Sequence, residues 1–99
     1  MAISRHYSTE RAEREAVIRQ IGDGEIIAEK QFNRGHKNGP EVYQVTTTGL
    51  IIVRNARTWR LVTKLIARPS QLDRWFGDEL PNSVYMEAWR HQEMGYHLL

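Results

Sequence analysis

The chain has 99 residues, of which 40% are hydrophobic, and its 14 Lys and Arg outnumber its 12 Asp and Glu only slightly. This length and composition suit one packed domain spanning residues 1–99, and the net charge of +2 does not by itself mark a nucleic-acid binder. The chain has no cysteine, no long apolar run and no apolar signal core near its start, so we expect no disulfide, no membrane contact and, by default, a cytoplasmic location.

The first half of the chain predicts one helix followed by strands. Apolar residues recur at helical spacing over residues 9–21, behind the capping residue types Ser8 and Thr9, and the Gly-Asp-Gly sequence at 22–24 ends the pattern. Strands are then predicted at 25–32, 42–46, 50–54 and 58–67. A polar, glycine-containing loop at 33–40 separates the first two strands, and the others are joined by short turns.

The C-terminal third predicts two helices. One begins at Ser70, with Asp73 in a capping-box-like position, and its apolar face carries Leu72, Trp75 and Phe76. The other begins at Asn82 or Ser83, and one side of it carries Val84, Tyr85, Ala88 and Trp89. Helices placed before and after a run of strands predict an α+β fold: an N-terminal helix, a four-stranded antiparallel meander and C-terminal helices.

A three-residue turn at 55–57 would pair the last two strands with position 54 opposite 58 and position 52 opposite 60. Side chains alternate between the faces of a sheet, so odd and even positions separate. The odd face is almost entirely apolar, needs a cover of helices, and comprises Ile51, Val53, Trp59, Leu61, Thr63 and Leu65. The even face mixes cations and hydroxyls around an apolar centre, and comprises Thr48, Leu50, Ile52, Arg54, Thr58, Arg60, Val62 and Lys64. A turn at 46–48 would also send Tyr43 and Val45 to the odd face.

The even face is the first candidate for a functional site. Between Pro40 and Gln71 the only acid is Glu41, while Arg54, Arg57, Arg60, Lys64 and Arg68 are basic. Such a stripe attracts anions, and an arginine fork matches the geometry of a phosphate. It is also what any solvated sheet face carries, so the alternative is an ordinary surface.

Metal-independent RNA cleavage needs a base, a cation that stabilises charge on phosphorus, and an acid. Arg54, Arg60 and Lys64 could stabilise the charge, and Thr58 and Arg57 could orient a phosphate. His6 or His36 could act as base or acid, because histidine titrates near neutrality. His36 and Lys37, in the glycine-containing loop, are secondary candidates for closing over an anionic ligand.

The order of elements resembles the RelE-like, barnase–EndoU–colicin type of endoribonuclease fold, which includes toxins and phage-associated nuclease-like domains. The local resemblance lies in His6 and Arg11 near the start, in GLIIVRN at 49–55, and in TWRLVTKLIARPSQLDRWF at 58–76. It implies RNA as substrate and a site at His6, Arg54, Arg60, Thr63 and Lys64. The alternation above conflicts with this set, because it places Thr63 on the apolar face and Lys64 on the other.

The remaining motifs favour simpler interpretations. The histidines lack the spacing of metal ligands, so we expect no metal or cofactor and expect His91 and His97 to be solvated. The three tryptophans fall on apolar faces and are expected to pack in the core. The last helix, with Tyr85, Met86 and Trp89, could instead meet a second subunit. Two hypotheses follow: an endoribonuclease or inactive RNA-binding relative, and a non-catalytic protein-interaction module or homodimer.

Overall fold

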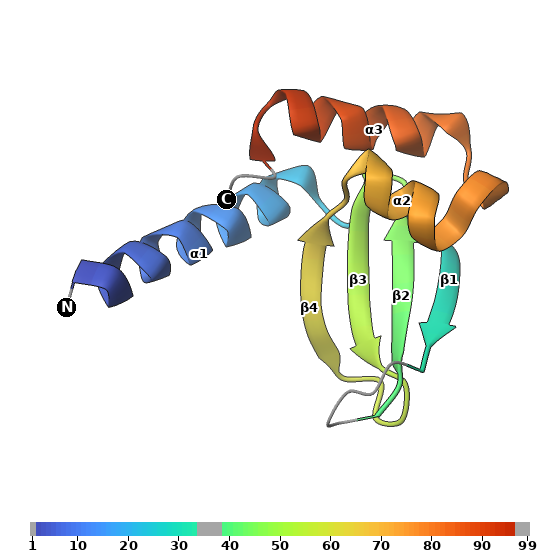
Figure 1. Cartoon of the computed structure of the whole chain (residues 1–99), viewed down its shortest axis with the longest axis horizontal. Coiled ribbons are helices and arrows are strands. Elements are labelled where there is room, and N and C mark those ends of the chain that lie inside the picture. Colours follow the sequence, from blue (N-terminus) through green and yellow to red (C-terminus); the bar gives the residue numbers. More distant parts are fainter. Residues whose placement is uncertain (1, 34–38, 97–99) are drawn as a thin grey trace.

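The computed structural model describes residues 2–33 and 39–96, and the side chains of residues 11–33 and 39–96. Its elements are α1 (Ala2–Ile21), β1 (Ile26–Phe32), β2 (Glu41–Thr46), β3 (Leu50–Asn55), β4 (Leu61–Ile66), α2 (Pro69–Phe76), the short 3-10 helix η1 (Gly77–Glu79) and α3 (Asn82–Glu93). The four strands form one sheet in the order β1-β2-β3-β4, and every neighbouring pair is antiparallel. The predicted α+β fold and meander are therefore confirmed (Figure 1).

Helix α1 begins at Ala2 rather than at residue 9. Ser8 and Thr9 therefore lie inside the helix and do not cap it, since no glycine or proline precedes them to break the helix. The helix ends as predicted at Gly22, whose φ of 78° suits glycine and whose N–H donates to Ile18 O at 3.1 Å. Figure 1 shows α1 leaving the sheet beside its β4 edge, with its N-terminal end directed away from the other elements.

The odd face of the sheet carries the core, as predicted. Tyr43 and Val45 lie on this face together with Ile51 and Val53, and all are buried. The helices α2 and α3 and the segment between them cover the face with the buried side chains of Leu72, Phe76, Leu80, Val84 and Ala88. Figure 1 shows α2 across the sheet and α3 above the end at which β2 turns into β3.

The predicted start of α2 is displaced by one residue. The helix begins at Pro69, and the N–H of Arg68 donates to Gln71 Oε1 at 2.9 Å, a role that the sequence had suggested for Ser70 and Asp73. Proline suits the first helical position because its missing N–H would have no partner there. The expected apolar face is present, with Leu72 and Phe76 buried and Trp75 half-buried.

The predicted pairing of β3 with β4 is wrong by four residues. Ile52 pairs with Lys64 and Val53 with Thr63, and the register shifts once between Val53 and Arg54. The connection is longer than expected because Asn55 Oδ1 accepts the N–H groups of residues 57 and 58, at 2.8 and 3.1 Å, and holds them in a turn. An error of an even number of residues leaves the faces unchanged, so Lys64 remains on the even face and Leu65 in the core.

The aromatic and apolar residues nearest this connection are nevertheless not buried. Trp59 precedes the strand and is 48% exposed, and the shift in register places Leu61 opposite Arg54, where it is 52% exposed. The prediction that both residues lie in the core is wrong. Trp89 on α3 is likewise 53% exposed, whereas Trp75 packs edge-on against Tyr43 with ring centroids 5.0 Å apart.

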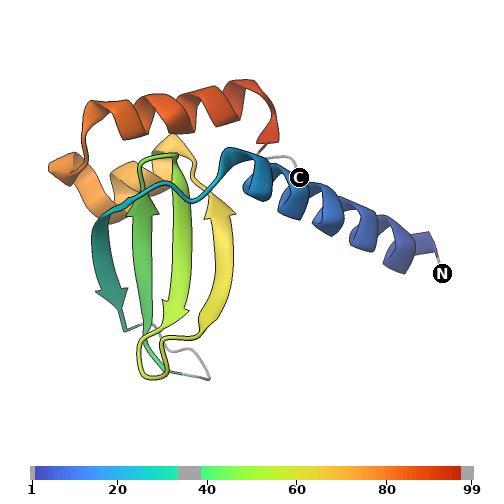
Figure 2. The same cartoon turned by 180° about the vertical axis from the view of Figure 1, so that it is seen from behind.

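The even face is less solvated than predicted. Val42, Gln44, Thr46, Leu50 and Ile52 are all buried. Figure 2 shows why at one end: the connection from α1 to β1 crosses this face near the β2–β3 turn. It is fastened there by Thr48 Oγ1, which donates to Gly22 O at 2.6 Å, and by Lys64, whose Nζ lies 2.8 Å from Asp23 Oδ1.

Candidate nucleic-acid interface

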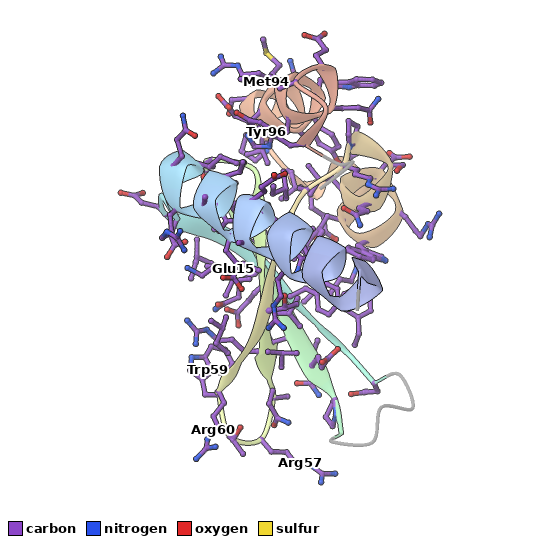
Figure 3. All side chains as sticks on the ribbon, turned by 90° about the vertical axis from the view of Figure 1, so that its left-hand side faces the viewer. Glu15, Arg57, Trp59, Arg60, Met94 and Tyr96 are labelled. Carbon is purple, nitrogen blue, oxygen red and sulfur yellow. The ribbon has the colours of Figure 1, made fainter. Side chains whose placement is uncertain are left out.

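A groove of about 280 Å³ runs between α1 and β4. Residues of α1 between Arg11 and Arg19 form one wall, and residues 61–64 of β4 form the other. Figure 3 shows α1 crossing in front of the β4 edge of the sheet, with Glu15 facing the strands. The groove exists because β4 is an edge strand, and Ile18, which is 8% exposed, anchors the helix against it.

The groove is strongly basic. Among the residues whose side chains the structure describes, Arg11, Arg14 and Arg19 on α1 and Lys64 on β4 line it together with a single carboxylate, Glu15. Arg11 Nε lies 3.4 Å from Glu15 Oε1 in an exposed pair, and Lys64 is paired with Asp23. Exposed pairs of this kind are weak and readily exchanged for a ligand.

Two of these cations are unengaged. Within residues 11–33 and 39–96, neither Arg14 nor Arg19 forms an ion pair, and the buried Nε of Arg14 has no hydrogen-bond acceptor. A buried donor without a partner is unfavourable, so an acceptor oxygen that reached it would gain a strong charge-assisted bond. The groove is thus suited to an oxyanion.

Exposed apolar side chains lie beside these cations. Leu61 and Val62 line the groove and are 52% and 50% exposed. Trp59, two residues before Leu61, has the left-handed φ of 63°, and its carbonyl accepts Arg54 Nη1 at 3.2 Å. The Arg54 guanidinium also lies 5.8 Å from the centroid of the indole. A tryptophan kept in a strained conformation and half in solvent is a candidate contact residue.

The structure brings together only part of the set of residues predicted from the sequence. Lys64 and Thr63 line the groove. Arg54 shares a face with Lys64, but its Nε donates to Gln44 Oε1 at 3.1 Å, and Gln44 in turn donates to Glu29. Its guanidinium is therefore held within the sheet.

The three predicted residues of the β3–β4 connection lie elsewhere. Thr58 accepts the N–H of Arg60, and Arg57 and Arg60 are exposed. Figure 3 shows Arg57 and Arg60 at the end of the sheet away from α3, pointing outward. Arg60 is thus not beside Lys64 as the predicted pairing required.

The other candidates cannot be placed in the groove. His6 falls within α1, in the stretch whose side chains the structure does not describe, and not ahead of the helix as the resemblance implied. His36 and Lys37 lie outside the described residues, as does His97.

The conflict over Thr63 is resolved by the position of the strand. Thr63 pairs with the core residue Val53, and Lys64 pairs with Ile52 on the opposite face, yet both residues line the groove. They can do so because the groove follows the free edge of β4, which both faces of the sheet border. Opposite faces therefore do not exclude a shared site at an edge strand.

Sequence analysis missed the contribution of α1. Arg11, Arg14 and Ile18 stand at helical spacing and so share one side of the helix, and Arg19 follows directly. This spacing is visible in the sequence, but the basic residues of the site were predicted on the strands alone. The helix supplies the majority of the cations in the groove.

A second pocket of about 280 Å³ lies at the C-terminal end of α1. It is formed where Gln20 and Ile21, the β2–β3 turn and the last part of α3 meet. His91 lines it and is only 4% exposed, so the prediction of a solvated histidine is wrong. A Cβ at Gly49 would lie 3.0 Å from His91 Cε1, which shows that the ring packs directly on the turn.

His91 should make folding stability depend on pH. Burial lowers its pKa below the ordinary value of 6.5, Glu87 partly offsets this, and Arg90 adds to the lowering. As the pH falls, the unfolded chain therefore takes up a proton first. The stabilisation is complete above pH 6.5 and is lost as the pH falls from that value through the lower pKa of the folded protein. We expect the urea midpoint to fall more between about pH 7 and about pH 5 in the wild type than in His91→Gln. Parallel pH profiles for the two proteins would contradict this account of His91.

Comparison of the chain with protein-family models, curated protein sequences and solved structures found no match. Across the described part of the chain, no helix combines the length and apolar character needed to cross a membrane.

Proposed function

We propose that this chain binds single-stranded RNA in the groove between α1 and β4. The observation that carries the proposal is the pair of guanidinium groups, Arg14 and Arg19, which have no ion-pair partner among the described residues. They lie on one wall of a groove whose other wall exposes Leu61 and Val62. Cations that follow a phosphate backbone and apolar or aromatic surfaces that receive unstacked bases are the two components of single-strand recognition.

A single strand fits this surface better than a duplex does. Bases in a duplex are stacked on one another, whereas a single strand can place its bases against exposed side chains such as Trp59. The C-terminal part of α1 lies beside β4, while its N-terminal part projects from the sheet (Figures 1 and 2). The proposed ligand therefore lies along the β4 edge with its phosphates toward α1.

Anisotropy of a labelled single-stranded RNA, measured at several salt concentrations, tests the proposal. For a single strand the logarithm of the affinity falls with the logarithm of the salt concentration by about 0.7 per neutralised phosphate. The cations of the groove predict a slope of about −1.5 to −3 and weaker binding to duplex RNA of the same length. Absence of binding at low salt, or equal affinity for the duplex, would contradict it.

Trp59→Gly should weaken RNA binding while leaving the stability of the fold nearly unchanged. Glycine adopts a positive φ without strain, which offsets its own entropy and the lost contact with Arg54, so we expect an unfolding free energy within about 1 kcal/mol of the wild type. Loss of one stacked base should weaken RNA binding about tenfold or more. Chemical denaturation and anisotropy give the two values.

Two further variants at this position serve as controls. Trp59→Tyr keeps a ring and should bind nearly as well as the wild type, whereas Trp59→Asn tolerates the same backbone without a large ring and should behave like glycine. Undiminished binding by Trp59→Gly would remove the indole from the interface.

Cleavage of the bound RNA, which the resemblance to endoribonucleases implies, requires a base near a 2′-hydroxyl. Glu15 is the sole carboxylate lining the groove in the described part of the chain, and His6 is the sequence candidate on α1. Incubation with end-labelled RNA in EDTA compares the wild type with His6→Ala. Cleavage that the variant loses supports a metal-independent endoribonuclease, and intact RNA with salt-sensitive binding supports an RNA-binding module.

The outer side of α3 favours self-association as a second candidate function. Met86 and Trp89 are 63% and 53% exposed, on the side opposite the buried Val84 and Ala88. Grouped apolar exposure of this kind is typical of contact surfaces. Sedimentation equilibrium of the wild type and of Trp89→Glu tests it: a dimer abolished by the substitution supports it, and a monomeric wild type rejects it.

A further inference from the structure

The pocket at His91 differs from the basic groove in its charge. Glu87 and Arg90, its two oppositely charged residues, lie with Oε2 and Nη1 3.7 Å apart. A phosphate would meet the carboxylate and a metal ion would meet the guanidinium, so neither suits the pocket. A ligand without net charge that offers both donors and acceptors avoids both conflicts.

The walls of the pocket suit a flat ring. The rings of His91 and Tyr96 have centroids 5.8 Å apart at an interplanar angle of 35°, and Ile21 and Met94 add apolar surface. The amide of Gln20, at the end of α1, supplies both a donor and an acceptor. The volume of about 280 Å³ lies at the lower limit of ligand sites, which corresponds to a ligand of one or two rings.

The buried His91 has a ring nitrogen whose hydrogen-bonding capacity is not used within the described residues. Its Nδ1 is shielded from solvent and has no hydrogen-bond partner among the described residues, while Gly49 fixes the ring in place. Buried polar groups in native proteins are rarely left without a partner unless they serve a function or a missing ligand. A neutral imidazole also presents one donor and one acceptor, which matches the edge of a heterocycle.

We propose that this pocket takes an unpaired nucleobase, stacked against Tyr96 and hydrogen-bonded by Gln20 and the charged pair of α3. The base could belong to a bound RNA or to a free nucleoside. The first source rests on the proposed function of the groove, and it is sterically reasonable because Arg19 lines the groove and the next residue, Gln20, lines the pocket. The second source does not depend on the groove.

Nuclear magnetic resonance titration of the full chain with adenosine and with uridine tests the pocket directly. We expect saturable shifts at Gln20, His91 and Tyr96, and none with ribose 5-phosphate. Tyr96→Ala should weaken nucleoside binding about tenfold and Gln20→Ala about fivefold, while Arg57→Ala, at the far end of the sheet, should have no effect. The Gln20 variant guards against a folding defect caused by loss of the Tyr96 ring.

Two oligonucleotides distinguish the sources. An RNA that shifts the three pocket residues, when an abasic strand of the same length does not, identifies the base as part of the strand. Pocket shifts with nucleosides but not with RNA identify a free nucleoside. If no nucleoside and no RNA moves these residues, or ribose 5-phosphate moves them equally, the inference is overturned. RNA binding that is salt-sensitive but shifts none of the pocket resonances, with either nucleosides or RNA, would overturn this inference alone and leave the groove's function intact.

Discussion

Replacing Phe76 by alanine lowers the free energy of unfolding by about 3–5 kcal/mol. Phe76 lies at the end of α2 and is 2% exposed. Its side chain is the largest of the fully buried ones that the structure describes. It joins the helical layer to the core residues of the odd face, so its removal opens a cavity at the contact between α2, α3 and the sheet. A small domain has only about 5–15 kcal/mol of stability, so this loss is a large fraction of the whole.

Trp89→Ala is the matched control for this prediction. It also deletes an aromatic ring from a C-terminal helix, but the ring is 53% exposed, so we expect a loss of no more than about 1 kcal/mol. Urea denaturation of both variants, followed by far-ultraviolet circular dichroism, gives the comparison. Equal losses would mean that the apolar outer side of α3 is buried in solution, and would support self-association.

Alternation along β2 and β3 was sufficient to predict the part of the core that these two strands carry, although it misplaced Trp59 and Leu61. Val45, Ile51 and Val53 alternate with residues of the other face, and the physical requirement that one face be covered placed them correctly beneath the helices. The alternation held even though the strand pairing was wrong, because an error of four positions does not exchange faces. The face of the sheet on which a residue lies is therefore predicted more reliably than the residue with which it pairs.

The β3–β4 connection could not be predicted in the same way. Its length depends on the side chain of Asn55 capping two backbone N–H groups, and on Trp59 adopting a φ normally reserved for glycine. Neither event leaves a periodic pattern in the sequence. Burial of Trp59 was therefore expected from its position on the apolar odd face, and its left-handed backbone conformation became visible only in the structure.

The candidate site combined predictable and unpredictable parts. Lys64 and Thr63 were identified as site residues from the sequence, but their partners were sought on the neighbouring strand. The groove depends instead on where α1 lies, and the direction of a helix that joins a sheet at its edge is set by the short connection at residues 22–25. Burial of His91 depends in the same way on the approach of α3 to the β2–β3 turn.

The double variant Arg14→Ala, Arg19→Ala should weaken binding of single-stranded RNA about 100-fold at low salt. Each guanidinium can make a charge-assisted bond to phosphate, and such bonds contribute about 1.5 kcal/mol or more each. The salt dependence should become less steep by about 1.4, because two fewer phosphates are neutralised. Alanine is favourable in a helix, so α1 and the thermal stability should be retained.

Arg57→Ala, Arg60→Ala removes the same charge from the end of the β3–β4 connection and provides the control. Its effect on RNA binding should be about tenfold at most, because neither residue lines the groove, although Arg60 is next to Trp59 in the chain. The comparison decides between two surfaces: the groove defined by α1, and the basic end of the β3–β4 hairpin, where the structure places the predicted site residue Arg60. A larger loss in the Arg57 and Arg60 variant would place the RNA on the hairpin and reject the groove, whereas the opposite result would make α1 the principal phosphate-binding element of the chain.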